Sequence, residues 1–186
     1  MRPVKHGHFA ALEPKDLPDF LQALEQNDAR LFVLTRHAIR LMMLTFVRTG
    51  ELIKATWGEF DLEGAEWLLP AERIKMRKAH IVPLSRQAVA LLRQLQTMGG
   101  GYDWVFPSQS KPGQHMSNNT ILKALERLGY KGRMTGHGFR ALAMTTIQEN
   151  LKYPHFRGGP SACPCRARLR CKPPMIAANT STNARR

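Results

Sequence analysis

Residues 66–84 read EWLLPAERIKMRKAHIVPL, and this stretch decides the fold class. Its two ends, EWLLP (66–70) and HIVPL (80–84), are short, apolar and flanked by Pro or charged residues, which is typical of β-strands. The segment between them, AERIKMRKA, carries the charge of an exposed hairpin. We therefore predict a small antiparallel sheet built from these two strands.

Two helical patterns precede the hairpin. Residues 14–27 predict a helix with one apolar face, because four apolar residues follow the i, i+3, i+4, i+7 spacing. These residues are Leu17, Phe20, Leu21 and Leu24. Residues 31–47 are apolar on most sides and predict a buried helix, which Gly50 is expected to interrupt before a short helix resumes in ELIKATW.

Three more helices are predicted after the hairpin. Ser85 and Ser117 are suitable N-caps for RQAVALLRQLQTM and NNTILKALERLGY, and glycines follow both segments. Their buried stripes are expected to contain Ala88, Leu91, Leu92 and Leu95, and then Ile121, Leu122 and Leu125. GHGFRALAMTTIQENL predicts the last helix, and DWVFPS (103–108) an extended piece. The predicted fold class is mainly α with a small antiparallel β-sheet (α+β).

The charge balance favours a polyanionic partner. The 186 residues contain 28 Lys and Arg against 14 Asp and Glu, a formal net charge of +14. Each cation that meets a phosphate releases counterions, so nucleic acid is the expected ligand, although a basic surface can also be inert. The sequence has no run of 18 apolar residues and no signal peptide, so we expect a cytoplasmic protein.

The composition changes near residue 151. All acidic residues come before this point, and residues 153–186 are rich in Pro, Cys, Gly and Arg without helical or strand periodicity. We expect an irregular basic tail without stable structure. A zinc site from His155, Cys163, Cys165 and Cys171 is the rival interpretation, but the cysteine spacing does not give a C-x2-C pair, so no metal is expected.

Three basic clusters could bind a phosphate. Arg48 is expected to close the predicted buried helix, where a guanidinium needs an anion. Lys75 lies in the hairpin, and His137 and Arg140 open the last helix on one face. Two guanidiniums, an imidazole and a helix N-terminus can together hold a phosphate. Each signal also has a plainer interpretation.

The plainer interpretations are structural. Arg48 can pair with Glu51, three residues on. His137 can cap the helix, and the charges of the hairpin can form an ordinary solvated turn. That turn contains Lys75, Arg77 and Lys78.

The order and spacing of these motifs are more specific than any single one. Arg48 in FVRTGELIKATW, Lys75 in KMRKAHIVPLS, and His137 and Arg140 in TGHGFRALAMTTIQE make residues 10–150 resemble the tyrosine recombinase family, in particular the integrases of temperate phages and genomic islands. Such enzymes cut and rejoin DNA without metal or cofactor. A Tyr hydroxyl attacks the scissile phosphate to form a 3′-phosphotyrosine, and a 5′-hydroxyl reverses the step.

The resemblance implies a role for each matching residue. Arg48 and Arg140 would bind the scissile phosphate, Lys75 would be the general acid, and His137 would assist proton transfer. Glu51 matches the acidic residue that orients the first Arg. Double-stranded DNA is the implied partner, contacted by Arg48, Lys75, Arg77, Lys78 and Arg140.

Two departures from the family pattern concern the ends of the chain. The second His or Trp and the nucleophilic Tyr should fall within 151–186; Tyr153 comes too soon after Arg140, and it and His155 match structural residues better. At the other end, related integrases begin with DNA-binding domains, whereas this sequence starts near the linker into the catalytic domain. We therefore predict a linker-like segment (1–12), a partial catalytic domain (13–152), incomplete at its C-terminus, and a tail (153–186) that resembles translation out of the ancestral frame.

Two functions follow as hypotheses. The first is a fragment of a recombinase for site-specific DNA recombination and integration, catalytically dead because the nucleophile is missing. The alternative is a non-catalytic DNA-binding accessory or decoy protein; a helix-turn-helix regulator fits less well, because of the predicted sheet. The family's tetrameric synaptic complex is not expected of this fragment.

Overall fold

The sheet predicted from residues 66–84 is present and has one strand more than predicted. In this computed structural model, which describes residues 10–73, 78–98, 101–111 and 113–151, β1 (Phe60–Asp61), β2 (Glu66–Leu69) and β3 (His80–Pro83) form an antiparallel sheet in the order β1-β2-β3. Leu69 pairs with His80 and Trp67 with Val82. β1 escaped the sequence analysis because two residues cannot show a period-2 pattern.

Trp67 anchors the inner face of the sheet. Its side chain is fully buried, and its ring stacks on Phe60 of β1 with the ring centroids 4.8 Å apart. Its Nε1–H donates to Glu59 Oε2 over 3.0 Å, so the one polar atom of this buried ring is satisfied. Leu68 and Ile81 pair on the opposite face and are both half exposed. One face of the sheet therefore joins the core.

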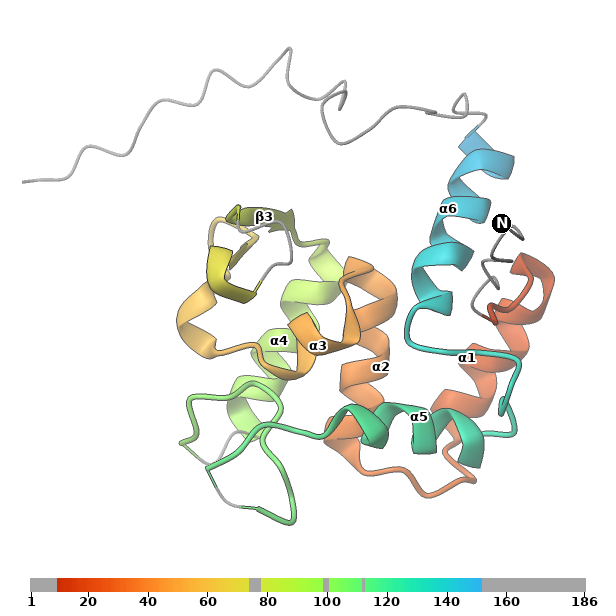
Figure 1. The fold of residues 1–186 in the computed structure, drawn as a ribbon, viewed down its shortest axis with the longest axis horizontal. Helices are drawn as coiled ribbons and strands as arrows, with labels where there is room; N and C mark the ends of the chain where they lie inside the picture. Colours follow the sequence, from red (N-terminus) through yellow and green to blue (C-terminus); the bar gives the residue numbers. More distant parts are fainter. Residues whose placement is uncertain (1–9, 74–77, 99–100, 112, 152–186) are drawn as a thin grey trace, which may run out of the picture. The chain divides into compact units, whose positions relative to one another are not determined.

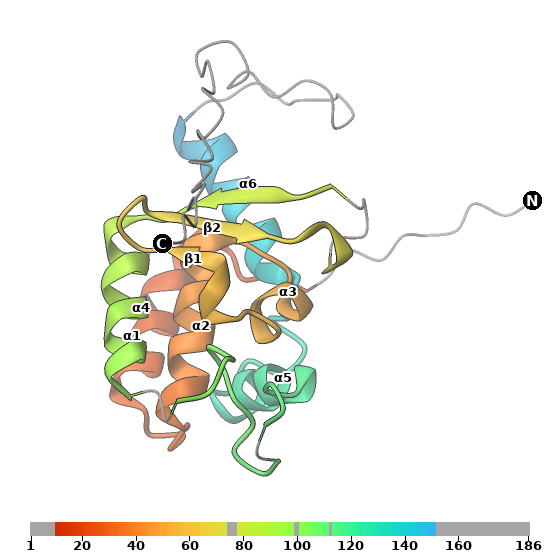
Figure 2. The same ribbon diagram turned by 90° about the vertical axis from the view of Figure 1, so that its left-hand side faces the viewer.

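Six α-helices and three short 3₁₀ turns are the other regular elements of the described chain. Their bounds are η1 Pro14–Asp16, α1 Leu17–Gln26, α2 Val33–Thr45, α3 Thr49–Ile53, η2 Trp57–Glu59, η3 Ala71–Arg73, α4 Arg86–Met98, α5 Asn118–Arg127 and α6 Gly138–Leu151. Helix α2 is central, in contact with α3, α4 and α5 (Figure 1). The sheet lies above α2 and α4 in Figure 2. The predicted mainly α fold with a small sheet is confirmed.

The predicted buried helix is shorter than expected and is interrupted earlier. α2 ends at Thr45 because Phe46 adopts the left-handed conformation (φ 54°), with its N–H on the Met42 carbonyl. Gly50 does not break the pattern: it lies inside α3, whose first residue is Thr49. Phe32 and Val33 are exposed at the start of α2, so burial along the whole of 31–47 was also wrong.

The predicted serine caps are confirmed. Ser85 Oγ accepts the Ala88 N–H at 3.2 Å, and Ser117 Oγ accepts the Asn119 N–H at 3.3 Å. The four residues predicted on the apolar stripe of α4 are all buried. On α5, however, Leu122 is 48% exposed, while Ala124 takes its place in the core. Leu122 follows Ile121 directly and therefore points about 100° around the helix from it, away from the core.

The structure describes only part of the two predicted end regions. All described residues belong to the compact unit Met1–Tyr153. The predicted linker (1–12) is described only from residue 10, and the predicted tail (153–186) lies outside the described residues. Within the described part of the chain, no helix is long and apolar enough to cross a membrane.

Candidate phosphate-binding site

Arg48 begins a helix; it does not end one. It is the N-cap residue of α3 in extended conformation, which corrects the prediction that it closes the buried helix. Its Nη1 donates to Glu51 Oε1 over 2.7 Å, and its backbone N–H donates to Glu51 Oε2 over 2.9 Å. The Glu51 side chain is 9% exposed, whereas that of Arg48 is 46% exposed. The burial argument therefore applies to Glu51, and Arg48 is the partner that it needs.

This ion pair is compatible with both interpretations of Arg48, the structural pairing with Glu51 and the binding of a phosphate. The pair is structural, yet a guanidinium has five N–H donors in a rigid fork, and Glu51 takes one nitrogen of it. The exposed remainder can still donate to an anion. Glu51 thus holds the Arg48 guanidinium at the start of α3. The orienting role that the resemblance implied stays a prediction.

Removing the Glu51 carboxylate should destabilise the fold. We expect Glu51→Ala to cost about 2 kcal/mol, because it takes the acceptor from both the Arg48 N–H and its guanidinium in a half-buried place. Glu63→Ala is the matched control, since Glu63 is 89% exposed and pairs only with the exposed Arg93. Urea unfolding followed by circular dichroism measures both. Equal midpoints for the two variants would contradict the assignment.

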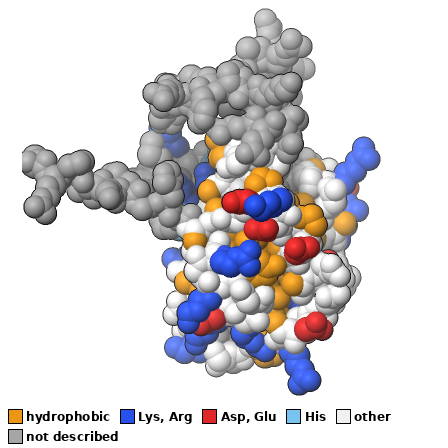
Figure 3. Space-filling model, turned by 90° about the vertical axis from the view of Figure 1, so that its right-hand side faces the viewer, with side chains coloured by type: hydrophobic (Ala, Val, Ile, Leu, Met, Phe, Trp, Pro, Cys, Tyr) orange, Lys and Arg blue, Asp and Glu red, His pale blue; other side chains and the backbone are white. Residues whose placement is uncertain are grey.

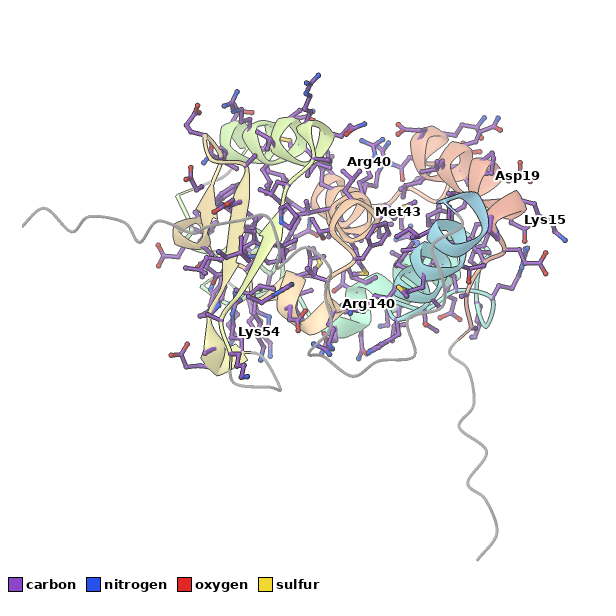
Figure 4. The ribbon with its side chains drawn as sticks, turned by 90° about the horizontal axis from the view of Figure 1, so that it is seen from above. Lys15, Asp19, Arg40, Met43, Lys54 and Arg140 are labelled. Atoms are coloured by element: carbon purple, nitrogen blue, oxygen red, sulfur yellow. The ribbon has the colours of Figure 1, made fainter. Side chains whose placement is uncertain are left out.

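His137 and Arg140 lie at the start of α6. The His137 carbonyl accepts the N–H groups of Arg140 and Ala141, at 3.1 and 3.4 Å, so His137 directly precedes the first turn. Both side chains are exposed. Arg140 Nη1 donates to the Phe46 carbonyl over 2.9 Å, which places Arg140 beside the connection between α2 and α3 (Figure 4). Arg48 follows two residues later on that connection, so the two predicted arginines come from adjoining segments.

A glycine makes this close approach possible. A Cβ added to Gly136 would lie 2.1 Å from Thr49 Oγ1 and 3.4 Å from Thr49 Cβ. A larger residue there would have to displace the Thr49 hydroxyl, because the nearest contact is this side-chain oxygen. Thr49 directly follows Arg48, so this contact fixes the segment carrying His137 against the one carrying Arg48. The sequence analysis did not identify Gly136 and Thr49 as site-forming residues.

The base of the hairpin is also tied to α3. Arg73, the last residue of η3, bonds to the Glu59 carboxylate and to the Lys54 carbonyl, and both side chains of the Arg73–Glu59 pair are largely buried. Lys54 directly follows α3 and lies beside the sheet in Figure 4. Lys75 and Arg77 lie outside the described residues, and Lys78 is exposed. Arg73 and Glu59 were missed, because a single Arg and Glu in a loop carry no motif.

The charge of the described surface is mixed elsewhere. On the face in Figure 3, Lys and Arg side chains alternate with Asp and Glu around a stripe of hydrophobic side chains. Such a face has no single-sign field to attract DNA. Among the described residues, no three His, Cys, Asp or Glu side chains lie together as metal ligands would. The cysteines and His155 of the rival zinc interpretation lie outside them, as does Tyr153.

Comparison with known proteins decides the family. The phage integrase family model matches residues 10–152, which is most of the chain. The chain belongs to this family. It is 44% identical to the prophage integrase IntZ of Escherichia coli K12 over 149 residues, and 40% identical to the integrase of Enterobacteria phage P4 over 161 residues. Each match covers 79% of this chain and 36% of the relative.

The integrase fold extends to more distant proteins. XerH recombinase, in a post-cleavage complex with a palindromic difH substrate, superposes with a TM-score of 0.62 at 19% identity, covering 80% of this chain and 45% of XerH. At that identity the likeness shows the fold alone. The predicted membership of the tyrosine recombinase and phage integrase family is thus confirmed, while the chain spans about a third of the length of the two curated relatives.

Proposed function

We propose that this integrase chain binds duplex DNA through the scissile-phosphate site of a recombinase and does not itself cleave it. The observation that carries the proposal is the contact between the Arg48 and Arg140 segments, made by the Arg140–Phe46 hydrogen bond and by the tight approach of Gly136 to Thr49. Two guanidiniums on adjoining segments, beside a helix N-terminus, can hold one phosphate by charge-assisted hydrogen bonds.

The resemblance implies one task for each matching residue in a complete recombinase, in which a Tyr hydroxyl attacks phosphorus and the P–O5′ bond breaks. Arg48 and Arg140 would stabilise the charge that grows on the phosphate. Lys75 would give its proton to the leaving 5′-oxygen, and His137 would assist this proton transfer. In this chain, which we propose lacks the nucleophile, Arg48 and Arg140 keep the phosphate contact. Glu51 holds the Arg48 guanidinium in position by accepting hydrogen bonds from the Arg48 N–H and Nη1. No metal or cofactor takes part in this scheme.

The attacking hydroxyl is what we propose this chain lacks. The 186 residues contain three tyrosines, Tyr102, Tyr130 and Tyr153. Tyr130 is buried, with its ring edge-on to Phe20 at 5.0 Å, and is therefore part of the core. Tyr102 lies in the connection between α4 and α5, by the cavity that Trp57 and Trp104 also line. Tyr153 follows the last residue of α6 by two positions, a separation from Arg140 too short for a separate nucleophile-bearing helix.

Two measurements on the full chain test the proposal. We expect binding to a short random-sequence duplex to weaken steeply with salt, with log K falling by about 0.9 per phosphate contact for each decade. We also expect no covalent adduct on a nicked duplex that carries the attachment site of the phage P4 relative, on which that relative serves as the positive control. An adduct that disappears in Tyr153→Phe would show that this chain has a nucleophile. Binding that is insensitive to salt would contradict the proposal that the chain contacts DNA phosphates.

A DNA-binding role without cleavage makes the chain an accessory or decoy at recombination sites. The burial of Tyr130 removes one candidate nucleophile from this chain. Its proposed partner is double-stranded DNA, and its proposed location is the bacterial cytoplasm, where that DNA lies. A tetrameric synaptic complex is not proposed for this chain.

A further inference from the structure

The N-terminal segment 10–12 lies directly against the first turn of α6. Thr135 Oγ1 donates to the Ala10 carbonyl over 3.3 Å and accepts the Gly138 N–H over 3.1 Å. Leu12 then enters the core with 5% of its surface exposed. One hydroxyl therefore joins the first described residue of the chain to the N-terminus of the helix that carries Arg140.

The absence of a side chain at Gly138 brings the two segments into backbone contact. A Cβ there would lie 2.3 Å from the Ala10 carbonyl oxygen and 3.1 Å from Ala11 Cα. Both neighbours are backbone atoms, which cannot rotate away as a side-chain tip can. The position of segment 10–12 and that of the α6 N-terminus are consequently linked: neither can shift by much without the other.

The opposite side of the same turn faces the phosphate site. Arg140 lies two residues after Gly138 and donates to the Phe46 carbonyl, while Gly136, two residues before Gly138, rests on Thr49. The turn is thus held between segment 10–12 on one side and the α2–α3 connection on the other. A displacement of segment 10–12 therefore moves the turn that presents Arg140.

We infer that Thr135 is a positioning residue, which sets the place of Arg140 by fastening segment 10–12 to the α6 N-terminus. The inference rests on the proposed phosphate role of Arg140. It means that a displacement of segment 10–12 changes the position of Arg140 at the phosphate site. Without the Thr135 hydroxyl, the Ala10 carbonyl loses its donor, and the Gly138 N–H keeps its 2.9 Å hydrogen bond to the Thr135 carbonyl but loses the one to Oγ1. The turn keeps its own backbone hydrogen bond and loses its tie to segment 10–12, so it can shift relative to Phe46.

A double-mutant cycle tests this inference on the full chain, with Thr135→Val and Arg140→Gln read by affinity for a random-sequence duplex. Valine keeps the shape of threonine and removes the hydroxyl. We expect Arg140→Gln to weaken binding about tenfold, the effect of one charge-assisted phosphate contact, and Thr135→Val to weaken it about threefold. In the Arg140→Gln background, Thr135→Val should cause no further loss. A threefold loss that persists there would overturn the inference, because Thr135 would then act without Arg140.

Two further variants separate positioning from folding. Thr135→Ser keeps the hydroxyl and should bind like the parent chain; a loss equal to that of Thr135→Val would overturn the inference. Gly138→Ala, which drives Ala10 away, should reproduce the threefold loss and its disappearance in the Arg140→Gln background. The duplex affinity of each variant is measured at a temperature below its unfolding transition, which circular dichroism locates. If Arg140→Gln itself leaves the affinity unchanged, the proposed phosphate site fails, whereas an effect of Thr135→Val that is zero or additive removes only the positioning role.

Discussion

Trp67→Ala is expected to remove a large part of the stability of the fold. The side chain is fully buried, stacks on Phe60 and donates to Glu59, so truncation opens a large cavity and leaves a buried carboxylate with fewer donors. Substitutions of buried Trp by Ala cost about 3–5 kcal/mol, and the total stability of a domain is about 5–15 kcal/mol. Since Trp67 joins the sheet to the core, the sheet should lose its order first.

Urea unfolding followed by far-ultraviolet circular dichroism measures this effect without depending on Trp fluorescence. Trp67→Phe is the matched control, because it keeps most of the apolar volume and loses only the hydrogen bond to Glu59, for about 1 kcal/mol. Trp57→Ala truncates a half-buried Trp and should also cost less. A Trp67→Ala midpoint no lower than that of Trp57→Ala would show that Trp67 does not hold the sheet in place.

The fold could be predicted where local pattern and tertiary burial agree. The α4 stripe, the Ser85 and Ser117 caps and the β2–β3 pair all follow from spacing and local hydrogen bonding. The errors come from tertiary context. Phe46 ends α2 in the left-handed conformation, which a Phe rarely adopts, and no local signal marks it. Ile121 and Leu122 both lie about one turn from Leu125, at i, i+4 and i, i+3, but only the arrangement of α5 on α2 decides that Ile121 is the one that is buried.

The candidate site divides in the same way. Its charged residues were predicted from motif order and stay a prediction, while the expected Arg48–Glu51 ion pair is present. The residues that bring the segments together could not, because their contribution is an absence or a backbone atom. Gly136 acts by lacking a Cβ, and Phe46 by offering its carbonyl. Such roles depend on what lies opposite in space, which a single sequence does not contain.

Replacing both arginines of the phosphate site should abolish most of the affinity for DNA. We expect Arg48→Gln/Arg140→Gln to weaken duplex binding about 100-fold at low salt, from two charge-assisted contacts of about 1.4 kcal/mol each. Glutamine keeps a donor for Glu51 and for the Phe46 carbonyl, so the local fold should persist. Removing two phosphate contacts should also make the salt slope of log K less steep by about 1.8. Fluorescence anisotropy across a salt series measures both quantities.

The control must remove the same charge from elsewhere on the chain. Arg86→Gln/Arg93→Gln does so on α4, where Arg93 forms an exposed ion pair with Glu63. If affinity depended on net charge alone, both double variants would lose the same amount, because each lowers the net charge by two. A site that holds a phosphate predicts a loss below about threefold for the α4 pair, since its members lie outside the direct contact and act through a screened field. Equal losses and equal salt slopes would therefore reduce the binding to general electrostatics and remove the specific roles of Arg48 and Arg140.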